Sequence, residues 1–254
     1  MFPEERQRKI LSMLDRQGRV SVNELSDRFD VSAVTIRADL QALAEAGTIV
    51  RTHGGAIPGD RGLRFLSLSR RLTEQVAEKE RIGQYGATLV SDGEAVFIDS
   101  SSTALSLARN LKRHRELTII TNALAVAQEM LEAPEVTVLL VGGRLRQDTA
   151  SLVDAGSMEA QLDGLNIQKG FFGAHGVDVV GGLTDVSIDE ADVKRLLVQL
   201  GLETIAVVDG TKWGRVGLAS FARLEQVDRI ITDAAAPTDA LEQVRALGVD
   251  VISV

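Results

Sequence analysis

Apolar residues near the start of the chain recur at the spacing of short amphipathic helices. Between residues 4 and 16, Ile10, Leu11 and Leu14 lie on one helical face. The motif SVNE that begins at Ser21 is typical of a capping box, in which serine and glutamate side chains satisfy free backbone amides at a helix start. The pattern therefore predicts a first helix over 4–16 and a second from about residue 22 to residue 28 or 29.

A third helix is predicted over residues 32–46, with Ser32 as its N-cap. The apolar residues Ile36, Leu40 and Leu43 form its buried stripe. Because a turn of only about four residues separates it from the second helix, the two are predicted to form a helix-turn-helix with the third as recognition helix.

The face of this helix opposite the stripe carries small and polar side chains. They are Val34, Arg37, Ala38 and Gln41, with Ala33 at the edge. Small residues allow the first turns to enter a major groove closely, where Arg37 can bond guanine and Gln41 adenine. Ser32 and Thr35, near the positive end of the helix dipole, suit phosphate contacts.

The segment TIVRTHGGAIP, residues 48–58, alternates apolar and polar residues and turns at Gly54 and Gly55. We expect a two-stranded wing from which Arg51 and His53 project toward the DNA backbone or minor groove. The alternative is an ordinary hairpin beside a solvated pair of helices.

The rest of the chain alternates apolar runs with helical patterns. Helices are predicted over 73–90, 103–111, 124–131, 188–200 and 237–247, and strands over 95–99, 117–121, 136–141, 168–173, 204–209, 228–232 and 249–253. Continuous apolar strands alternating with helices predict an α/β fold with a mostly parallel sheet covered on both faces.

Polar residues follow five of these strands, where parallel sheets bind ligands. The strand ends hold Asp99, Ser100, Ser101, Ser102 and Thr103; Thr121 and Asn122; Gly142, Gly143 and Arg144; Gly173, His175 and Gly176; and Asp209 and Lys212. Backbone amides at 101–103 open a helix and suit an anion such as phosphate, although a capped helix without ligand would have the same pattern. Together the strand ends predict a site for a small, phosphorylated molecule.

Two charged residues on the helix over 188–200 complete the predicted site. Lys194 joins Lys212 as a candidate cation, and Glu190 joins Asp209 as a candidate acceptor for hydroxyl groups. Because Lys194 follows Glu190 by four positions, a surface ion pair is the alternative.

Composition excludes several classes of function. The 254 residues include no cysteine, and the three histidines are far apart, so we expect no metal site and no cofactor. Neither a secretory signal nor an apolar run of the ~18 residues that a membrane span needs is present, so we expect a cytoplasmic protein. The net charge of −8 is uneven, with 14 basic against 12 acidic residues up to residue 81 and 14 against 24 beyond it. A mildly basic head on an acidic body favours a small nucleic-acid reader.

The segment VSAVTIRADLQALAEAGTIVRTHGGAI resembles the winged helix-turn-helix of the DeoR family of bacterial transcription regulators. The resemblance implies that Thr35, Arg37, Arg51, His53 and Gly54 face DNA.

The body also resembles the DeoR-type sensor domain, which is related in fold to ribose-5-phosphate isomerase. The resemblance implies a phosphate loop at Asp99–Thr103 and further effector contacts at the other strand ends, Glu190 and Lys194. It also implies a sugar phosphate or related metabolite as effector, and a homodimer or homotetramer. We expect a DNA-binding domain over 1–58, a linker over 59–74 and a sensor and oligomerisation domain over 75–254.

An active sugar-phosphate isomerase is the rival hypothesis. The isomerase pattern D-G-A-D-E carries three acids, which Phe172, His175 and Gly176 replace here, and Val180 replaces its lysine. Glu190 alone, without an electrophilic partner, should give only slow isomerisation of a sugar phosphate. His175 also departs from the smaller polar residue common in the sensor family, and either reads a sugar hydroxyl or fills space.

A helix-turn-helix that binds protein is a second alternative, which the salt dependence of binding would separate from DNA recognition. We expect a repressor of carbohydrate-metabolism genes that binds double-stranded operator DNA, without enzymatic activity or membrane contact. Oligomers would place two recognition helices in successive major grooves, and the effector would shift their relative orientation.

Overall fold

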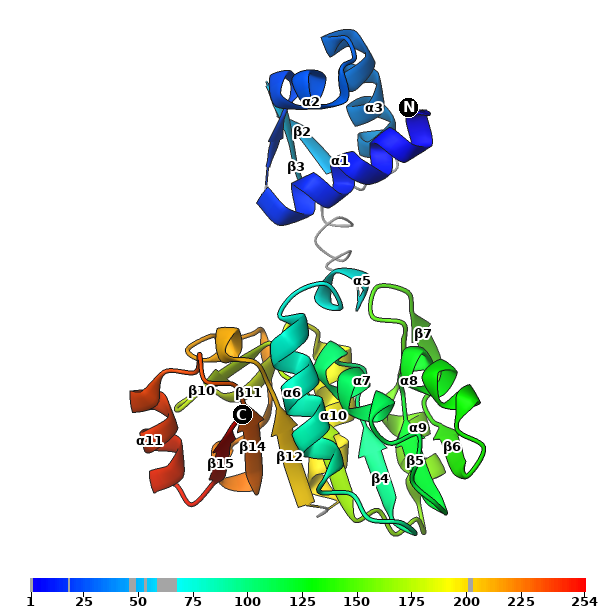
Figure 1. Cartoon of the computed structure of the whole chain (residues 1–254), viewed down its shortest axis with the longest axis vertical. Helices are drawn as coiled ribbons and strands as arrows, with labels where there is room; N and C mark the ends of the chain where they lie inside the picture. The colour runs from blue at the N-terminus through cyan, green and yellow to red at the C-terminus, as the bar shows by residue number, and fades with distance from the viewer. Residues whose placement is uncertain (1, 18, 46–48, 53, 59–67, 201–202) are drawn as a thin grey trace. The chain divides into compact units, whose positions relative to one another are not determined.

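The computed structural model describes residues 2–17, 19–45, 49–52, 54–58, 68–200 and 203–254. The chain separates into two compact units, Met1–Arg70 and Arg71–Val254 (Figure 1). We call them the head and the sensor unit. The predicted linker falls partly on residues 59–67, outside the described residues, so its boundaries stay a prediction.

The head contains the predicted helix-turn-helix and wing. Its elements are α1 (Pro3–Gln17), β1 (Val20–Ser21), α2 (Val22–Phe29), α3 (Ala33–Glu45), β2 (Ile49–Thr52) and β3 (Gly55–Pro58). The Ser21 hydroxyl accepts from the Glu24 amide at 3.2 Å, and the Ser32 hydroxyl accepts from the Thr35 amide at 3.1 Å. These two caps fix where α2 and α3 begin. Strand β3 pairs antiparallel with both β1 and β2.

The head packs around the predicted stripe of α3. Ile36 and Leu40 are fully or almost fully buried, against Ile10 of α1 and Leu25 of α2. A charged residue, Asp39, is buried on the same face of α3 and is 4% exposed. Its carboxylate accepts from Arg6 Nε at 2.5 Å and Arg6 Nη2 at 3.2 Å, joining α1 to α3 through a two-point ion pair. The sequence reasoning did not identify this pair.

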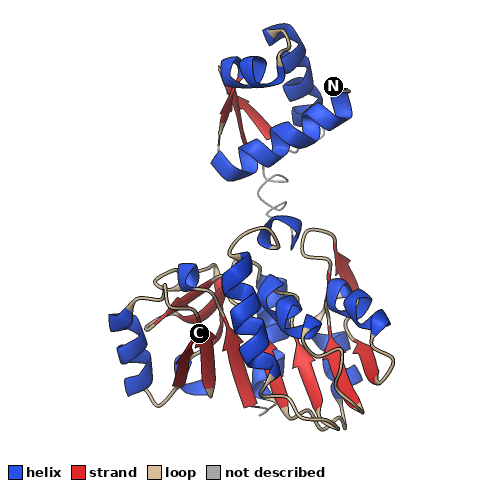
Figure 2. Ribbon diagram, in the orientation of Figure 1, coloured by secondary structure: helices blue, strands red, loops and turns tan. Residues whose placement is uncertain are grey.

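The sensor unit is built on a parallel sheet, as predicted. Within the described residues seven strands form it in the order β15-β14-β12-β9-β4-β5-β6, and each neighbouring pair is parallel. Figure 2 draws the strands of the chain as red arrows and its helices in blue. In chain order the seven strands of the sheet are β4 (Ala95–Ile98), β5 (Leu117–Thr121), β6 (Val136–Leu140), β9 (Lys169–Phe172), β12 (Glu203–Val207), β14 (Arg229–Thr232) and β15 (Asp250–Ser253).

Helices cover both faces of this sheet, because successive strand residues point to opposite sides. They are α6 (Val76–Ala87), α7 (Ser102–Arg109), α8 (Leu124–Glu129), α9 (Ala155–Leu162), α10 (Ile188–Gln199) and α11 (Thr238–Ala246), with short 3-10 turns at Met130–Glu132, Gly210–Lys212 and Leu224–Gln226. The short helix α5 (Leu68–Arg71) spans the boundary between the two units in the chain. Val96 and Ile98 of β4 pack in the core with α6, α7 and α8, whereas Phe97 packs with α9, α10 and α11. The Phe97 ring stacks on Phe172 of β9 at a centroid distance of 5.7 Å.

Short antiparallel elements lie outside the main sheet and were not predicted. Strands β10 (Gly176–Asp178), β11 (Gly182–Asp185) and β13 (Ala219–Ala222) form a second sheet, and β7 (Arg144–Arg146) pairs with β8 (Ser151–Val153). Helix α9 was also missed. These segments are too short for periodicity to reveal them.

A close contact between α6 and α7 depends on Gly83. A Cβ atom added there would lie 2.7 Å from the backbone of Ser106 and Leu107. Gly83→Ala should therefore destabilise the sensor unit by about 1–3 kcal/mol, the usual cost of overpacking a core. Calorimetry of the full chain would measure this, with Gly156→Ala of α9 as the matched control, because a Cβ added there meets only an ordinary contact at 3.7 Å. Equal stability of Gly83→Ala and wild type would contradict the close packing.

Candidate nucleic-acid interface and effector site

The recognition helix α3 presents the predicted face to solvent. Val34 is 73% exposed, and Arg37, Ala38 and Gln41 are exposed, whereas Ala33 and Thr35 are half-buried. This face holds one guanidinium, one amide and otherwise small side chains, and the exposed carboxylate of Glu45 follows one turn after Gln41. The face can approach a major groove closely while Arg37 reaches base edges.

The wing lies beside this helix. Arg51 of β2 donates a hydrogen bond to Gln41 Oε1, and Gln41 Nε2 donates to Glu45 Oε1 at 2.8 Å. Gly54 is exposed, and its carbonyl accepts from the Val22 amide at 2.9 Å. His53 lies outside the described residues. The link between Gln41 and Arg51 brings a helix residue and a wing residue to one surface.

The five polar segments predicted at strand ends follow adjacent strands of one sheet. In spatial order they follow β12, β9, β4, β5 and β6, and all these strands run parallel. Their carboxyl ends therefore meet at the same edge of the sheet, which is where parallel sheets bind ligands. A sixth polar strand end, at Asp233 after β14, was missed, and its carboxylate accepts from the Gly210 and Ala235 amides at 2.6 and 2.8 Å.

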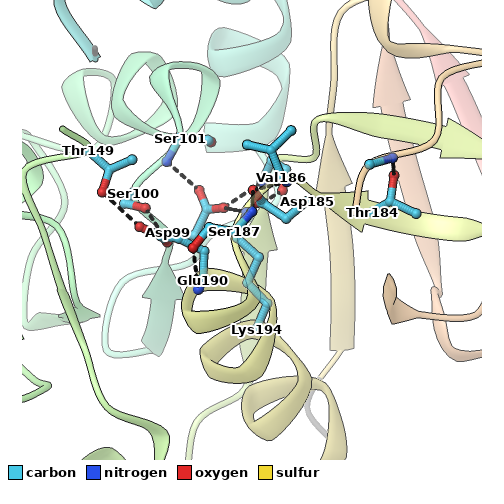
Figure 3. A network of polar contacts seen from close by, with 12 residues as sticks. Asp99, Ser100, Ser101, Thr149, Thr184, Asp185, Val186, Ser187, Glu190 and Lys194 are labelled. Atoms are coloured by element: carbon cyan, nitrogen blue, oxygen red, sulfur yellow. Dashed lines mark hydrogen bonds and ion pairs between the residues drawn. The ribbon is translucent and has the colours of Figure 1, made fainter. Parts of the chain in front are cut away.

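Lys194 of α10 lies at the centre of a buried polar network (Figure 3). It is 4% exposed, and its Nζ lies 3.0 Å from Asp99 Oδ2 and 2.9 Å from Asp185 Oδ2. It also donates to the Gly173 carbonyl at 2.8 Å. Burial lowers the pKa of Lys194, but the carboxylates of Asp185, Asp99 and Glu190 outweigh it and raise the pKa above its usual value. The alternative of a surface ion pair with Glu190 is wrong, because both side chains are buried.

Glu190 binds hydroxyl groups of the protein itself (Figure 3). Its carboxylate accepts from Ser100 at 3.0 Å, Thr149 at 2.8 Å and Ser151 at 2.5 Å. The predicted hydroxyl acceptor therefore holds the turn before β8 against the end of β4. Because a carboxylate offers about four acceptor positions, these three groups leave about one for an effector hydroxyl.

The predicted phosphate loop, which follows β4, is shaped by Asp99. Its carboxylate accepts from the Ser101 amide at 2.9 Å and the Gly173 amide at 2.8 Å. A side chain at Gly173 would collide with Ser101, since an added Cβ would lie 2.3 Å from Ser101 Cβ. Ser101 caps α7 by accepting from the Ala104 amide at 3.1 Å. The amides of Ser102 and Thr103, in the first turn of the helix, have no acceptor within the helix and can bind an anion.

The segment after β5 contains Thr121, whose hydroxyl is bonded within the fold, and Asn122, whose side-chain oxygen can accept a further hydrogen bond. The Thr121 hydroxyl is fully buried, donates to the Ile98 carbonyl at 2.7 Å and accepts from the Ala123 amide at 3.0 Å. Asn122 donates to the Leu152 carbonyl at 3.0 Å, but its buried Oδ1 has no partner among the described residues. A ligand hydroxyl or a water would satisfy that oxygen.

The segment after β6 turns sharply. Gly142 has a φ of 123°, and a Cβ there would lie 2.6 Å from Leu152 Cβ. Gly143 is exposed, and Arg144 is exposed and pairs with Asp189 at 2.9 Å. The strand end after β6 is therefore more exposed to solvent than the other strand ends of the site.

Cations gather beyond the ends of β9 and β12. Lys212 Nζ lies 4.0 Å from Asp209 Oδ2, and Asp209 is 1% exposed. Burial lowers the pKa of His175, and so do the charges of Lys212, Arg215 and Arg71, while Asp185 opposes them. At neutral pH the His175 imidazole is therefore uncharged and can donate and accept one hydrogen bond each.

Two cations of this group, Lys79 of α6 and Arg71 of α5, were missed by sequence reasoning. Lys79 is 5% exposed, and its Nζ donates to the Glu74 carbonyl at 2.6 Å and to the Arg71 carbonyl. Burial lowers the pKa of Lys79 to about 8, opposed by the charge of Asp209 and reinforced by Lys212. Lys79 gave no signal in the sequence, because an amphipathic helix pattern does not show that a lysine is buried.

A winged helix-turn-helix head on an α/β unit with a polar strand-end site defines the class of ligand-responsive DNA-binding regulators. Residues 6–60 match the DeoR-like helix-turn-helix domain, and residues 74–234 match the DeoR C-terminal sensor domain. The chain belongs to the DeoR family of transcriptional regulators, which confirms the predicted family and fold class.

Three relatives span nearly the same length. The chain is 39% identical over 234 residues to the HTH-type transcriptional regulator GolR of Listeria innocua serovar 6a, covering 92% of this chain and 91% of the relative. It is 33% identical over 241 residues to the glycerol-3-phosphate regulon repressor of Escherichia coli (strain K12), covering 94% of each. It is 31% identical over 233 residues to the HTH-type transcriptional repressor GlcR of Bacillus subtilis (strain 168), covering 92% and 89%.

Among solved structures, the chain is similar to ribose 5-phosphate isomerase A of Methanocaldococcus jannaschii, with a TM-score of 0.38 and 17% identity over 53% of each chain. A likeness of this size carries no conclusion about activity. No helix in the described part of the chain is long and apolar enough to cross a membrane. Within the same residues, no cluster of three acidic or histidine side chains is arranged to hold a metal ion.

Proposed function

We propose that this chain represses carbohydrate-metabolism genes and that a phosphorylated sugar or related metabolite, bound at the strand ends of the sensor unit, controls its hold on operator DNA. The gathering of Lys79 and Lys212 at the edge of the sheet where α7 begins carries the proposal. The names of relatives, a glycerol-3-phosphate regulon repressor and other transcriptional regulators, agree with it.

Packing supports the placement of Lys79 beside the α7 amides. Helix α6 leads into β4 and α7 leads out of it, and both pack on the same face of the sheet. Each helix therefore runs opposite to β4, so the two helices run in the same direction. Gly83 packs on Ser106 and Leu107, and Lys79 lies one helical turn before Gly83. Lys79 is therefore level with the first turn of α7, where Ser102 and Thr103 offer amides to an anion.

The contacts disfavour the isomerase hypothesis. Glu190, the remaining carboxylate at the base position, accepts from three protein hydroxyls. Phe172 is packed in the core, and Val180, in place of the isomerase lysine, is 96% exposed. A base held in this way, with no cation at the position of the isomerase lysine, supports binding rather than turnover.

We further propose that two copies bind repeated half-sites, each through α3 and its wing. Effector binding would shift the equilibrium between DNA-binding and non-binding arrangements by about 1–3 kcal/mol, the usual size of such couplings.

Arg37→Ala should weaken binding to an operator selected from a random duplex pool by about 5–150-fold, because one bidentate base contact contributes about 1–3 kcal/mol. Fluorescence anisotropy measures the affinity. Arg109→Ala, an exposed arginine of α7, should bind DNA like wild type. Equal affinity of wild type and Arg37→Ala would remove Arg37 from the interface. The salt dependence separates DNA recognition from the protein-binding alternative. For DNA, a plot of log K against log[salt] should fall with a slope of about −0.9 for each phosphate contact. An association constant that does not change with salt would favour the protein-binding alternative.

A thermal-shift screen tests the effector site directly. Phosphorylated sugars and glycerol 3-phosphate should raise the unfolding midpoint of the full chain, because a ligand at about 100 times its Kd adds about 2.7 kcal/mol. Their unphosphorylated counterparts are the control and should give no shift. Rapid isomerisation of a sugar phosphate by the chain would overturn the proposal in favour of the enzyme.

A further inference from the structure

Arg71 is the first residue of the sensor unit and the last residue of α5. Its guanidinium Nε and Nη2 are buried, and neither atom has a hydrogen-bond partner among the described residues. A guanidinium stays charged at any physiological pH, so these two donors are buried in charged form without an acceptor. Such groups are costly and are rare in native structures, unless a ligand or water completes them.

The surroundings of Arg71 indicate which ligand would complete it. Its carbonyl accepts from Lys79, and its charge lowers the pKa of both Lys79 and His175, as does the charge of Lys212. Asp209, the carboxylate that acts most on Lys79, is already bound to the amide and hydroxyl of Thr211. A group of cations that exceeds its available carboxylates attracts an anion, and the planar fork of an arginine matches phosphate oxygens in pairs.

We infer that Arg71 binds the phosphate of the effector, and that effector charge is thereby sensed at the residue where the chain enters the sensor unit from the head. This inference rests on the proposed function, which it deepens by naming a phosphate contact and a route for the signal. A phosphate held by Arg71 fixes α5, the four residues that end the connection from the head. The chain itself then links occupancy of the site to the segment leading to the DNA-binding head.

Inorganic phosphate, compared with chloride at equal ionic strength, is the probe for the full chain. Thermal unfolding gives its affinity, and hydrogen exchange reports on the backbone from Leu68 to Lys79. In wild type, phosphate should raise the unfolding midpoint and slow exchange in this segment. In Arg71→Gln, the apparent affinity should fall about 10-fold or more, as expected from losing hydrogen bonds to a charged group, and exchange should no longer respond.

Two further variants keep the test decisive. Arg71→Lys retains the charge without the fork and should recover part of the affinity, and Arg81→Gln, an exposed arginine on α6, should behave like wild type. A response to phosphate in Arg71→Gln equal to wild type, with the response lost in Lys212→Gln, would overturn the role of Arg71 and leave the effector site in place. Absence of any response in wild type would overturn both the site and this inference.

Discussion

Lys194→Met should destabilise the sensor unit by about 3–5 kcal/mol, the usual cost of removing one partner from a buried ion pair. The substitution preserves most of the side-chain volume but leaves Asp99 and Asp185 without the cation that lies within 3.0 Å of both. It also removes the donor to the Gly173 carbonyl, which holds the end of β9. Calorimetry of the full chain should show a lowered transition for the sensor unit, with the transition of the head unchanged.

The pH dependence of this effect identifies its cause. In wild type, burial raises the pKa of Asp185, but the charge and hydrogen bond of Lys194 outweigh burial and lower it. Asp185 thus contributes stability above its unfolded pKa of about 3.9, which is lost as the pH falls through the lower folded value. Without Lys194, only the amides of Val186 and Ser187 oppose burial, so the folded pKa of Asp185 rises relative to wild type. The deficit of the variant should therefore be largest at neutral pH and should shrink on acidification.

Two comparisons control the Lys194 experiment. Lys194→Met combined with Asp185→Asn should recover part of the stability, because one uncompensated charge has been removed. Lys112→Met, which breaks surface pairs with Glu129 and Glu132, should leave the transition almost unchanged. A deficit that is independent of pH, or a double variant less stable than the single one, would contradict the electrostatic explanation.

The periodic parts of the fold could be predicted from the sequence. Strand β5 was predicted at its observed bounds, 117–121, and β4 within one residue, because both are apolar runs that end at polar residues. The strand ends could be assigned to one edge of the sheet for the same reason, since parallel strands bring their carboxyl ends together. Short antiparallel strands such as β10 gave no such signal.

The partners of site residues could not be predicted in the same way. Lys194 was expected to be a cation of the site, but its carboxylate partners lie outside the helical pattern of α10: Asp99 follows β4, far earlier in the chain, and Asp185 ends β11. Glu190 was expected to accept effector hydroxyls, yet the fold brings three protein hydroxyls to it. Helical periodicity fixes which face a side chain occupies and does not report which element packs on that face.

The sequence did contain one signal that went unused. Asp39 follows Ile36 by three positions and precedes Leu40, so the helical pattern places a carboxylate on the buried stripe of the recognition helix. A carboxylate in that position needs a cationic partner, because a buried unpaired charge is strongly destabilising. The partner, Arg6, is in α1, more than thirty residues earlier.

Asp39→Ala should therefore unfold or severely weaken the head, with a cost of about 3–5 kcal/mol, because Arg6 would remain buried without its two-point partner. Domains of this size have total stabilities near the lower end of about 5–15 kcal/mol, so the loss is a large share of the whole. Calorimetry should show the head transition lowered or absent and the sensor transition intact.

Operator binding should disappear in Asp39→Ala through loss of folding, whereas Arg37→Ala should lose affinity with the head still folded. Asp27→Ala, an exposed carboxylate on α2, is the matched control and should leave both transitions in place. Replacing both partners, Arg6→Leu with Asp39→Leu, should restore part of the stability because no charge is then left unpaired. If Asp39→Ala were as stable as wild type, the ion pair between α1 and α3 would not hold the recognition helix in position.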